Sequence, residues 1–193
     1  MKTAYAVAGL AAAALVVFVI AITTDRRPLS APVTPAAAPP VQQQPVGPNM
    51  LAIPQIQALE SQVAANPGDM VSTLQLANLL HDNRFFDRAI QYYRSYLKKD
   101  PKNADARVDL GICLHELGSD EEAKKEMKQA LADNPKHLNA TFNLGIITLT
   151  QGNLSESKEW FEKTVTLSPN SELGKRAQQL LTQHSPQLLQ KPQ

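Results

Sequence analysis

Between residues 70 and 169, hydrophobic and polar residues follow one pattern three times, with a period of 34 residues. In each copy a large apolar residue precedes a small one at the seventh and eighth positions, as in Leu76-Ala77 and Leu110-Gly111. Another small residue occupies the twentieth position, and a large one usually occupies the twenty-fourth. Small residues let two antiparallel helices approach closely, while large residues beside them fill the remaining space. The pattern therefore predicts three pairs of antiparallel helices.

A proline closes each copy, and a fourth precedes the first copy at the same spacing. These prolines are Pro67, Pro101, Pro135 and Pro169. Proline cannot continue a helix, so each one marks the end of a helix pair. The predicted repeats span residues 70–103, 104–137 and 138–171.

Both ends of the array are predicted to be caps. The stretch "PQIQALESQVAANP" ends in an in-register proline but has no first helix before it, so we interpret it as the second helix of a half repeat. Ser171 can cap a final helix over residues 172–183, whose apolar residues share one face. Residues 184–193 are expected to be a disordered tail. Terminal repeats need such solvated caps, and the repeat domain is predicted over residues 55–183.

This pattern resembles the tetratricopeptide repeat (TPR), and the second copy, "ADARVDLGICLHELGSDEEAKKEMKQALADNP", matches its signature almost fully. The resemblance covers residues 55–183. It implies an all-α helix–turn–helix solenoid of three repeats, with an N-terminal half repeat and a C-terminal capping helix. The third copy departs from the signature at Thr148 and Ser157, so we expect it to pack slightly less well.

Residues 4–22 contain no charged residue. As a helix they would span ~28 Å, close to the ~30 Å hydrocarbon core of a bilayer. We therefore predict that residues 1–27 are a transmembrane signal anchor of a single-pass protein in the bacterial inner membrane, with the repeat domain in the periplasm. Basic residues flank the stretch on both sides, which weakens the orientation. A cleaved signal peptide is the alternative.

Residues 28–54 contain eight prolines and no charge, so they are predicted to be a disordered linker. Two PxxP sequences in this segment leave open a docking site for an SH3-like partner instead.

Charge and chemistry narrow the class of function. The chain carries a net charge of +1, and the part after residue 27 is near neutral, so no nucleic-acid partner is expected. No catalytic motif or cofactor-binding motif occurs, and we predict neither an enzyme nor a cofactor. His81 and His115 hold equivalent positions, which could suggest a metal pair, but neighbouring repeats lie ~10 Å apart. Solvated histidines are the simpler interpretation, and Cys113 is interpreted as an inert core thiol.

TPR arrays hold a peptide or a partner's helix on the concave face of their first helices, and the resemblance implies the same face here. The implied groove residues are Leu74, Asn78, His81, Asp105, Val108, Ile112, His115, Phe142, Ile146 and Leu149. The apolar members would form an outward-facing strip, which usually marks an interaction site. Asp82, Asp105 and Glu116 would give it an acidic rim. Alternatively, the C-terminal helix or a second subunit covers part of the strip.

These features favour a membrane-tethered scaffold or chaperone-like adaptor that holds a partner segment in its groove. Two phrases, "LANLLHDNRFFDRAIQYYRSYL" and "DLGICLHELG", are also similar to the repeat domains of bacterial cytochrome c maturation proteins. The alternative is a structural protein that self-assembles through its groove or cap.

Overall fold

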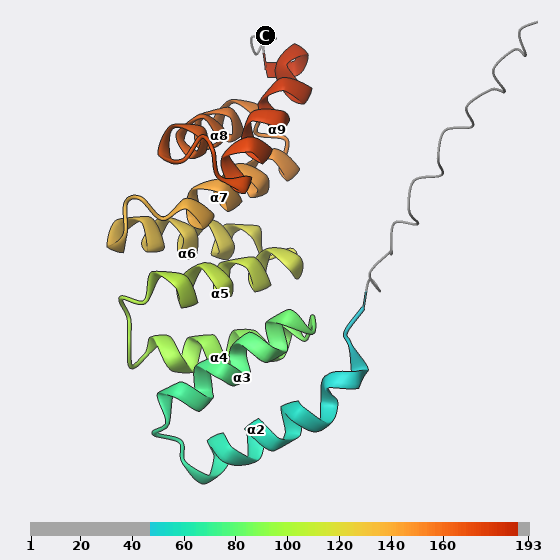
Figure 1. The fold of residues 1–193 in the computed structure, drawn as a ribbon, viewed down its shortest axis with the longest axis vertical. Helices are drawn as coiled ribbons and strands as arrows, with labels where there is room; N and C mark the ends of the chain where they lie inside the picture. Colours follow the sequence, from blue (N-terminus) through green and yellow to red (C-terminus); the bar gives the residue numbers. More distant parts are fainter. Residues whose placement is uncertain (1–46, 189–193) are drawn as a thin grey trace, which may run out of the picture. The chain divides into compact units, whose positions relative to one another are not determined.

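The computed structural model describes residues 47–188, which are helical and contain no β-strand. A short 3-10 turn, Met50–Ala52, precedes eight α-helices in this part of the chain. The helices are α2 (Ile53–Ala65), α3 (Met70–Asp82), α4 (Phe86–Leu97), α5 (Ala104–Glu116), α6 (Asp120–Asp133), α7 (Leu138–Thr150), α8 (Leu154–Leu167) and α9 (Glu172–Leu188). Figure 1 shows the pairs α3–α4, α5–α6 and α7–α8 stacked in chain order between α2 and α9. The predicted all-α repeat solenoid is confirmed.

The residue before each first helix caps it, and this position is the last of the preceding repeat. The Asp69 carboxylate accepts backbone N–H bonds of 3.0 and 3.1 Å at the start of α3. Asn103 does the same for α5 at 3.0 Å, and the Nδ1 atom of His137 does so for α7 at 3.3 Å. A side-chain acceptor satisfies amides that have no partner within the helix. The caps therefore fix where each repeat begins.

In the second and third repeats, the small residue at the eighth position lets the two helices of the pair approach closely, as the sequence predicts. A Cβ atom added at Gly111 would lie 2.8 Å from the Cε atom of Met127. A Cβ atom added at Gly145 would lie 2.6 Å from Cε1 of Phe161. Both glycines are buried. A larger residue at Gly145 would collide with a rigid ring, whereas one at Gly111 would require the flexible end of Met127 to move.

The third repeat does not show the looser packing that its hydroxyl residues suggest. Ser157 is buried, and its hydroxyl donates to the Gly145 carbonyl at 3.0 Å. Thr148 is also buried, and its hydroxyl donates to the Leu144 carbonyl at 2.7 Å. A buried hydroxyl is costly only when it lacks a partner. Hydrogen bonding to the backbone therefore compensates for both departures from the signature.

Ion pairs connect successive second helices at a spacing of 28 residues. The pairs are Glu60 with Arg88, Arg94 with Glu122 at 2.7 Å, and Lys128 with Glu156 at 3.6 Å. Exposed ion pairs contribute little stability individually, about 0–1 kcal/mol. Their regular spacing shows instead that each helix pair is added to the stack with the same register.

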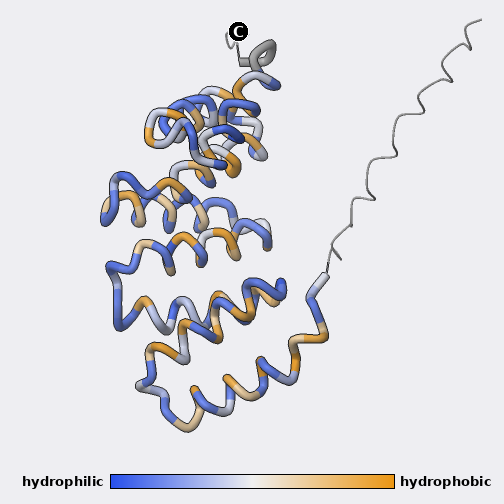
Figure 2. The backbone as a smooth tube through the Cα atoms, in the orientation of Figure 1, coloured by the Kyte–Doolittle hydropathy of each residue, from blue (hydrophilic) through white to orange (hydrophobic). Residues whose placement is uncertain are grey.

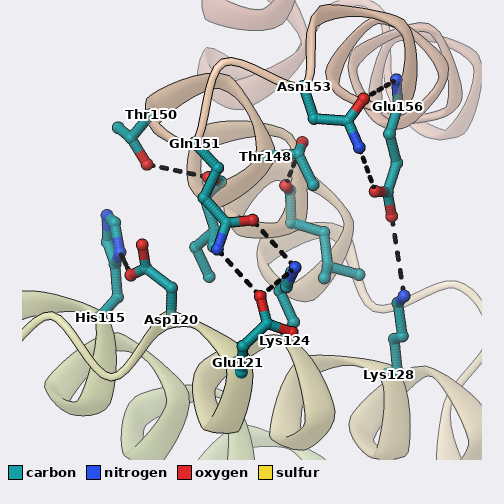
Figure 3. A network of polar contacts seen from close by, with 12 residues as sticks. His115, Asp120, Glu121, Lys124, Lys128, Thr148, Thr150, Gln151, Asn153 and Glu156 are labelled. Atoms are coloured by element: carbon teal, nitrogen blue, oxygen red, sulfur yellow. Dashed lines mark hydrogen bonds and ion pairs between the residues drawn. The ribbon is translucent and has the colours of Figure 1, made fainter.

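Between the second and third repeats, further polar contacts lie beside the last of these pairs (Figure 3). The Glu121 carboxylate accepts from Gln151 at 3.1 Å and pairs with Lys124 at 2.7 Å, while Lys124 also donates to Gln151 at 2.9 Å. These contacts give Glu121 a structural role at the junction of the two repeats.

The structure corrects the predicted localisation. No helix within residues 47–188 is both long and apolar enough to span a bilayer. A spanning helix needs about 20 predominantly apolar residues, whereas α9, the longest described helix, has 17 residues and includes Lys175 and Arg176. Figure 2 shows polar residues along every helix. A single-pass inner-membrane protein with a periplasmic domain is therefore not what the described residues show. The stretch 4–22, on which that prediction depended, lies outside them.

Two predicted boundaries differ from the observed ones. The α9 helix continues to Leu188 rather than ending at residue 183. Once the packed apolar face has nucleated the helix, each added residue gains a backbone hydrogen bond at low cost. At the other end, helical structure begins at Met50, inside the predicted linker. Residues 28–46, like residues 189–193, lie outside the described part.

Candidate partner-binding groove

The first helices of successive repeats lie side by side, whereas the second helices do not. Helix α3 contacts α5, α5 contacts α7, and α7 contacts α9. The backbones of α4 and α6, and of α6 and α8, do not approach each other in this way, and the long side chains of the ion pairs bridge the wider gap. Helices that crowd together on one side of a stack and separate on the other make the stack curve toward the crowded side. The first helices and α9 therefore line the concave face.

A cavity of about 190 Å³ lies on this face between α5, α7 and α9. Its apolar lining includes Ile112, Phe142, Ile146 and Ile147. Its polar lining consists of His115, Glu116, Asn143 and Arg176. The lining is about evenly divided between apolar and polar surface, and a concave site with convergent polar groups is the default candidate for binding.

The predicted apolar strip is narrower than the sequence suggests. Four predicted groove residues, Leu74, Ile112, Ile146 and Leu149, are half-buried. Val108 is only 1% exposed and Phe142 only 5%, so neither faces outward as predicted. Val108 belongs to the main core, because its helix packs against both neighbouring pairs.

Helix α9 accounts for the burial in the third repeat. Phe142, Phe161 and Ala177 form a second apolar core, against which Ile146, Leu149 and Leu180 pack. The ring centroids of Phe142 and Phe161 are 5.7 Å apart, and the Arg176 guanidinium lies 5.7 Å from the Phe142 centroid. The alternative that the C-terminal helix covers part of the strip therefore holds for this repeat.

Two of the predicted polar groove residues, Asn78 and His81, contact side chains of their own repeat. Tyr93 donates to the Asn78 side-chain oxygen at 2.8 Å, although Asn78 itself is exposed. The His81 ring lies 6.1 Å from the Phe86 ring and 6.4 Å from the Tyr93 ring, between centroids.

The other predicted polar residues form two histidine–carboxylate contacts. His115 donates from Nδ1 to Asp120 at 2.6 Å (Figure 3). His137 donates from Nε2 to Asp105 at 2.9 Å. Within residues 47–188, no group of three or more histidine, cysteine, aspartate or glutamate side chains is placed to hold a metal ion.

Asp109 is a groove residue that the sequence analysis missed. It follows Asp105 by four residues and precedes Ile112 by three, which places all three on one face of α5. Burial raises the pKa of the Asp109 carboxyl, and the charges of Asp105 and Asp82 raise it further. The helical spacing alone would have identified it.

Cys113 has the structural role predicted for it. The side chain is fully buried, and burial raises the pKa of its thiol to about 12. A thiol with such a pKa is protonated at neutral pH and is a poor nucleophile.

Comparison with known protein families also indicates a TPR-type repeat domain. The model described as the cilia and flagella-associated protein 70 middle TPR-like domain matches residues 73–188, more than half of the chain. The chain belongs to this TPR-like family. No curated protein sequence matches it. The TPR assignment drawn from the repeated pattern is therefore confirmed.

Solved structures share the TPR fold of this chain at low sequence identity. A crystal structure of MamA has 21% identity and a TM-score of 0.59, covering 69% of this chain and 81% of MamA. The first TPR domain of Spaghetti (RPAP3), bound to the HSP90 peptide SRMEEVD, has 20% identity and a TM-score of 0.56. The match covers 61% of this chain and 93% of that domain. The Arabidopsis OM64 TPR domain has 18% identity and a TM-score of 0.55, and the match covers 67% of this chain and 98% of that domain. At these identities the likeness shows the fold alone.

Proposed function

We propose that this TPR-like protein is a binding scaffold rather than an enzyme, and that it holds a segment of a partner protein on its concave face. The groove comprises the exposed faces of α3, α5 and α7 together with the cavity between α5, α7 and α9. Ile112 lines that cavity, and Leu74 of α3 supplies a further half-buried apolar side chain. A solved TPR structure with a bound peptide, the RPAP3 domain, supports peptide binding as a use of this fold.

The cavity is the observation that carries the proposal. Its apolar lining comes from Ile112 of α5, Met127 of α6 and residues of α7, and α9 contributes Arg176. Burial of a partner's apolar side chain there would remove apolar surface from water, at ~25 cal/mol per Å². The surrounding polar groups would orient the segment.

Photo-crosslinking at two matched positions tests the proposal. The crosslinker p-benzoylphenylalanine is introduced at Asn143, which lines the cavity, or at Gln129, which is exposed on α6. After irradiation in living cells, we expect a discrete partner adduct from Asn143 and none from Gln129. Adding Ile146→Asp or Ile112→Ser should remove that adduct while circular dichroism still shows a folded helical protein. Equal adducts from both positions, or an adduct that survives both variants, would contradict the proposal.

Self-assembly through the groove or cap is the alternative role. In the same experiment it would give an adduct whose mass is twice that of the chain. A narrower role in cytochrome c maturation stays a prediction that depends on two short sequence phrases.

A further inference from the structure

We propose that His137 makes the start of α7 sensitive to pH, because its neutral imidazole caps the helix and its protonated form cannot. His137 is the last residue before α7, at the junction of the second and third repeats. The inference goes beyond the proposed function, and only its effect on a partner depends on the groove.

The two ring nitrogens of His137 make different contacts, and together these contacts require the neutral imidazole. Nδ1 accepts the Ala140 backbone N–H at 3.3 Å, so it carries no hydrogen. Nε2 lies 2.9 Å from Oδ1 of Asp105 and carries the hydrogen of that contact. His137 is only 8% exposed, so water does not readily replace either partner.

Histidine stands where the other two first helices have caps that do not titrate near neutral pH. Asp69 and Asn103 cap α3 and α5 through side-chain oxygens at the equivalent position. An amide does not ionise, and an aspartate stays charged well below pH 7, so both caps persist in mild acid. An imidazole instead gains a proton between about pH 5 and 8. Among the three first helices, α7 is therefore the one whose cap changes in this range.

Protonation would remove the cap without releasing the ring. The added hydrogen goes onto Nδ1, which then changes from an acceptor to a donor. It would point at the Ala140 N–H, a second donor, and a buried backbone amide would lose its partner. The Nε2 contact with Asp105 stays, because that nitrogen keeps its hydrogen, and it holds the ring opposite the amide.

The charged groups around His137 decide what protonation gains. Asp105 contacts the ring, and Asp109, also on α5, interacts with it electrostatically. Asp133 ends α6, Lys136 directly precedes His137, and α7 contains no titratable side chain. The Asp105 side chain is 91% exposed, and an ion pair with such an exposed group is weak. Protonation therefore exchanges a buried cap for a weak charged contact.

The loss of this cap would reach the proposed groove through α7. Phe142 lies two residues after Ala140, and α7 also supplies Asn143 and Ile146 to the cavity lining. A helix without its cap frays at its first turn. Under the proposed function, the partner would therefore be held less tightly in acid.

Native-state amide exchange of the full-length ¹⁵N-labelled chain measures the cap directly. The readout is the protection factor of the Ala140 amide divided by that of the Ala106 amide, which Asn103 caps at 3.0 Å. Dividing the two removes changes that affect the whole chain. We expect the ratio to fall about fivefold from about pH 8 to about pH 5, in line with the loss of one cap. In His137→Asn, which copies the cap of α5, the ratio should not change with pH.

A second measurement covers the case in which His137→Asn does not fold. In the unaltered protein, the ¹⁵N shifts of the His137 ring should show a bare Nδ1 at about pH 8, and a protonated one over the range in which Ala140 loses protection. A hydrogen on Nδ1 at the higher pH, a constant protection ratio, or an equal fall in His137→Asn would each overturn the inference. No partner is present in these measurements, so their outcome is independent of the proposed function.

Discussion

Arg84 adopts a backbone conformation that glycine takes in the other repeats. Its φ is 64°, and the equivalent residues, Gly118 and Gly152, both have φ of 76°. All three occupy the turn between the first and second helix of their repeats. The left-handed region costs a residue with a side chain roughly 1–2 kcal/mol.

Arg84→Gly should therefore be more stable than Arg84→Ala by about 1 kcal/mol. Both variants lose the guanidinium contacts with Glu116 and the Phe86 ring. The difference in stability between them therefore reports only the cost of the left-handed backbone conformation. Urea unfolding followed by circular dichroism measures the difference. Equal midpoints would mean that the turn is not strained in the way its φ indicates.

Asp109 lowers the free energy of unfolding as the pH rises, which is the opposite of what a carboxylate in an ion pair does. Its pKa is raised in the folded protein, mainly by burial, so its ionisation destabilises the fold. Below the ordinary carboxyl pKa this cost is absent, and it develops as the pH rises through the raised pKa. The titratable groups that interact electrostatically with Asp109 are Asp82 and His81 of α3, Tyr93 of α4, Asp105 and Cys113 of α5, and His137 before α7.

Asp109→Asn should consequently raise the thermal unfolding midpoint at pH 7 relative to the unaltered protein, and this gain should shrink toward pH 3. The exposed Asp87 supplies the control, since Asp87→Asn should give no comparable pH-dependent gain. A gain that is the same at both pH values would contradict the effect of burial on this carboxyl.

At the scale of elements, the two close helix pairs should tolerate a methyl group differently. An added Cβ at Gly111 meets the flexible end of Met127, whereas one at Gly145 meets the rigid Phe161 ring. We expect Gly145→Ala to destabilise the fold by ~1–3 kcal/mol and Gly111→Ala by clearly less. Denaturant unfolding of the two variants checks the order, and the reverse order would contradict the packing described here.

Most of the element-scale structure was predictable from the sequence. The 34-residue spacing gives the helix pairs, because small residues and prolines impose local constraints that any stack must satisfy. The repeat pattern alone left the burial of Phe142 open, since it depends on how Arg176 and α9 pack over the third repeat. Asp109 was missed although its helical position was readable, because the family pattern directed attention to other positions.

At the scale of the described repeat domain, residues 47–188, the stack contains two apolar cores. The larger one extends from α2 to α7, while the smaller one joins α7, α8 and α9. In repeat arrays each unit contacts only its neighbours, so stability is nearly a sum of local terms. The C-terminal end should therefore open without the rest of the stack.

Phe161→Ala should show this independence. Loss of the buried ring costs about 3–5 kcal/mol locally, and amide hydrogen exchange in α9 should accelerate strongly while exchange in α3 and α4 changes little. Leu76→Ala, in the larger core, is the matched variant and should accelerate exchange at the other end. Uniform acceleration by both variants would show instead that the stack unfolds as one cooperative unit.

Chemical-shift mapping with the crosslinked partner's binding segment tests the central claim most directly. The ¹⁵N-labelled protein is titrated with that segment, and each backbone amide reports its own change. The account predicts that the largest shifts cluster on α3, α5, α7 and the start of α9, around Asn78, Ile112 and Asn143. Shifts concentrated on α4, α6 and α8 would show that the partner binds the convex face, and would contradict it.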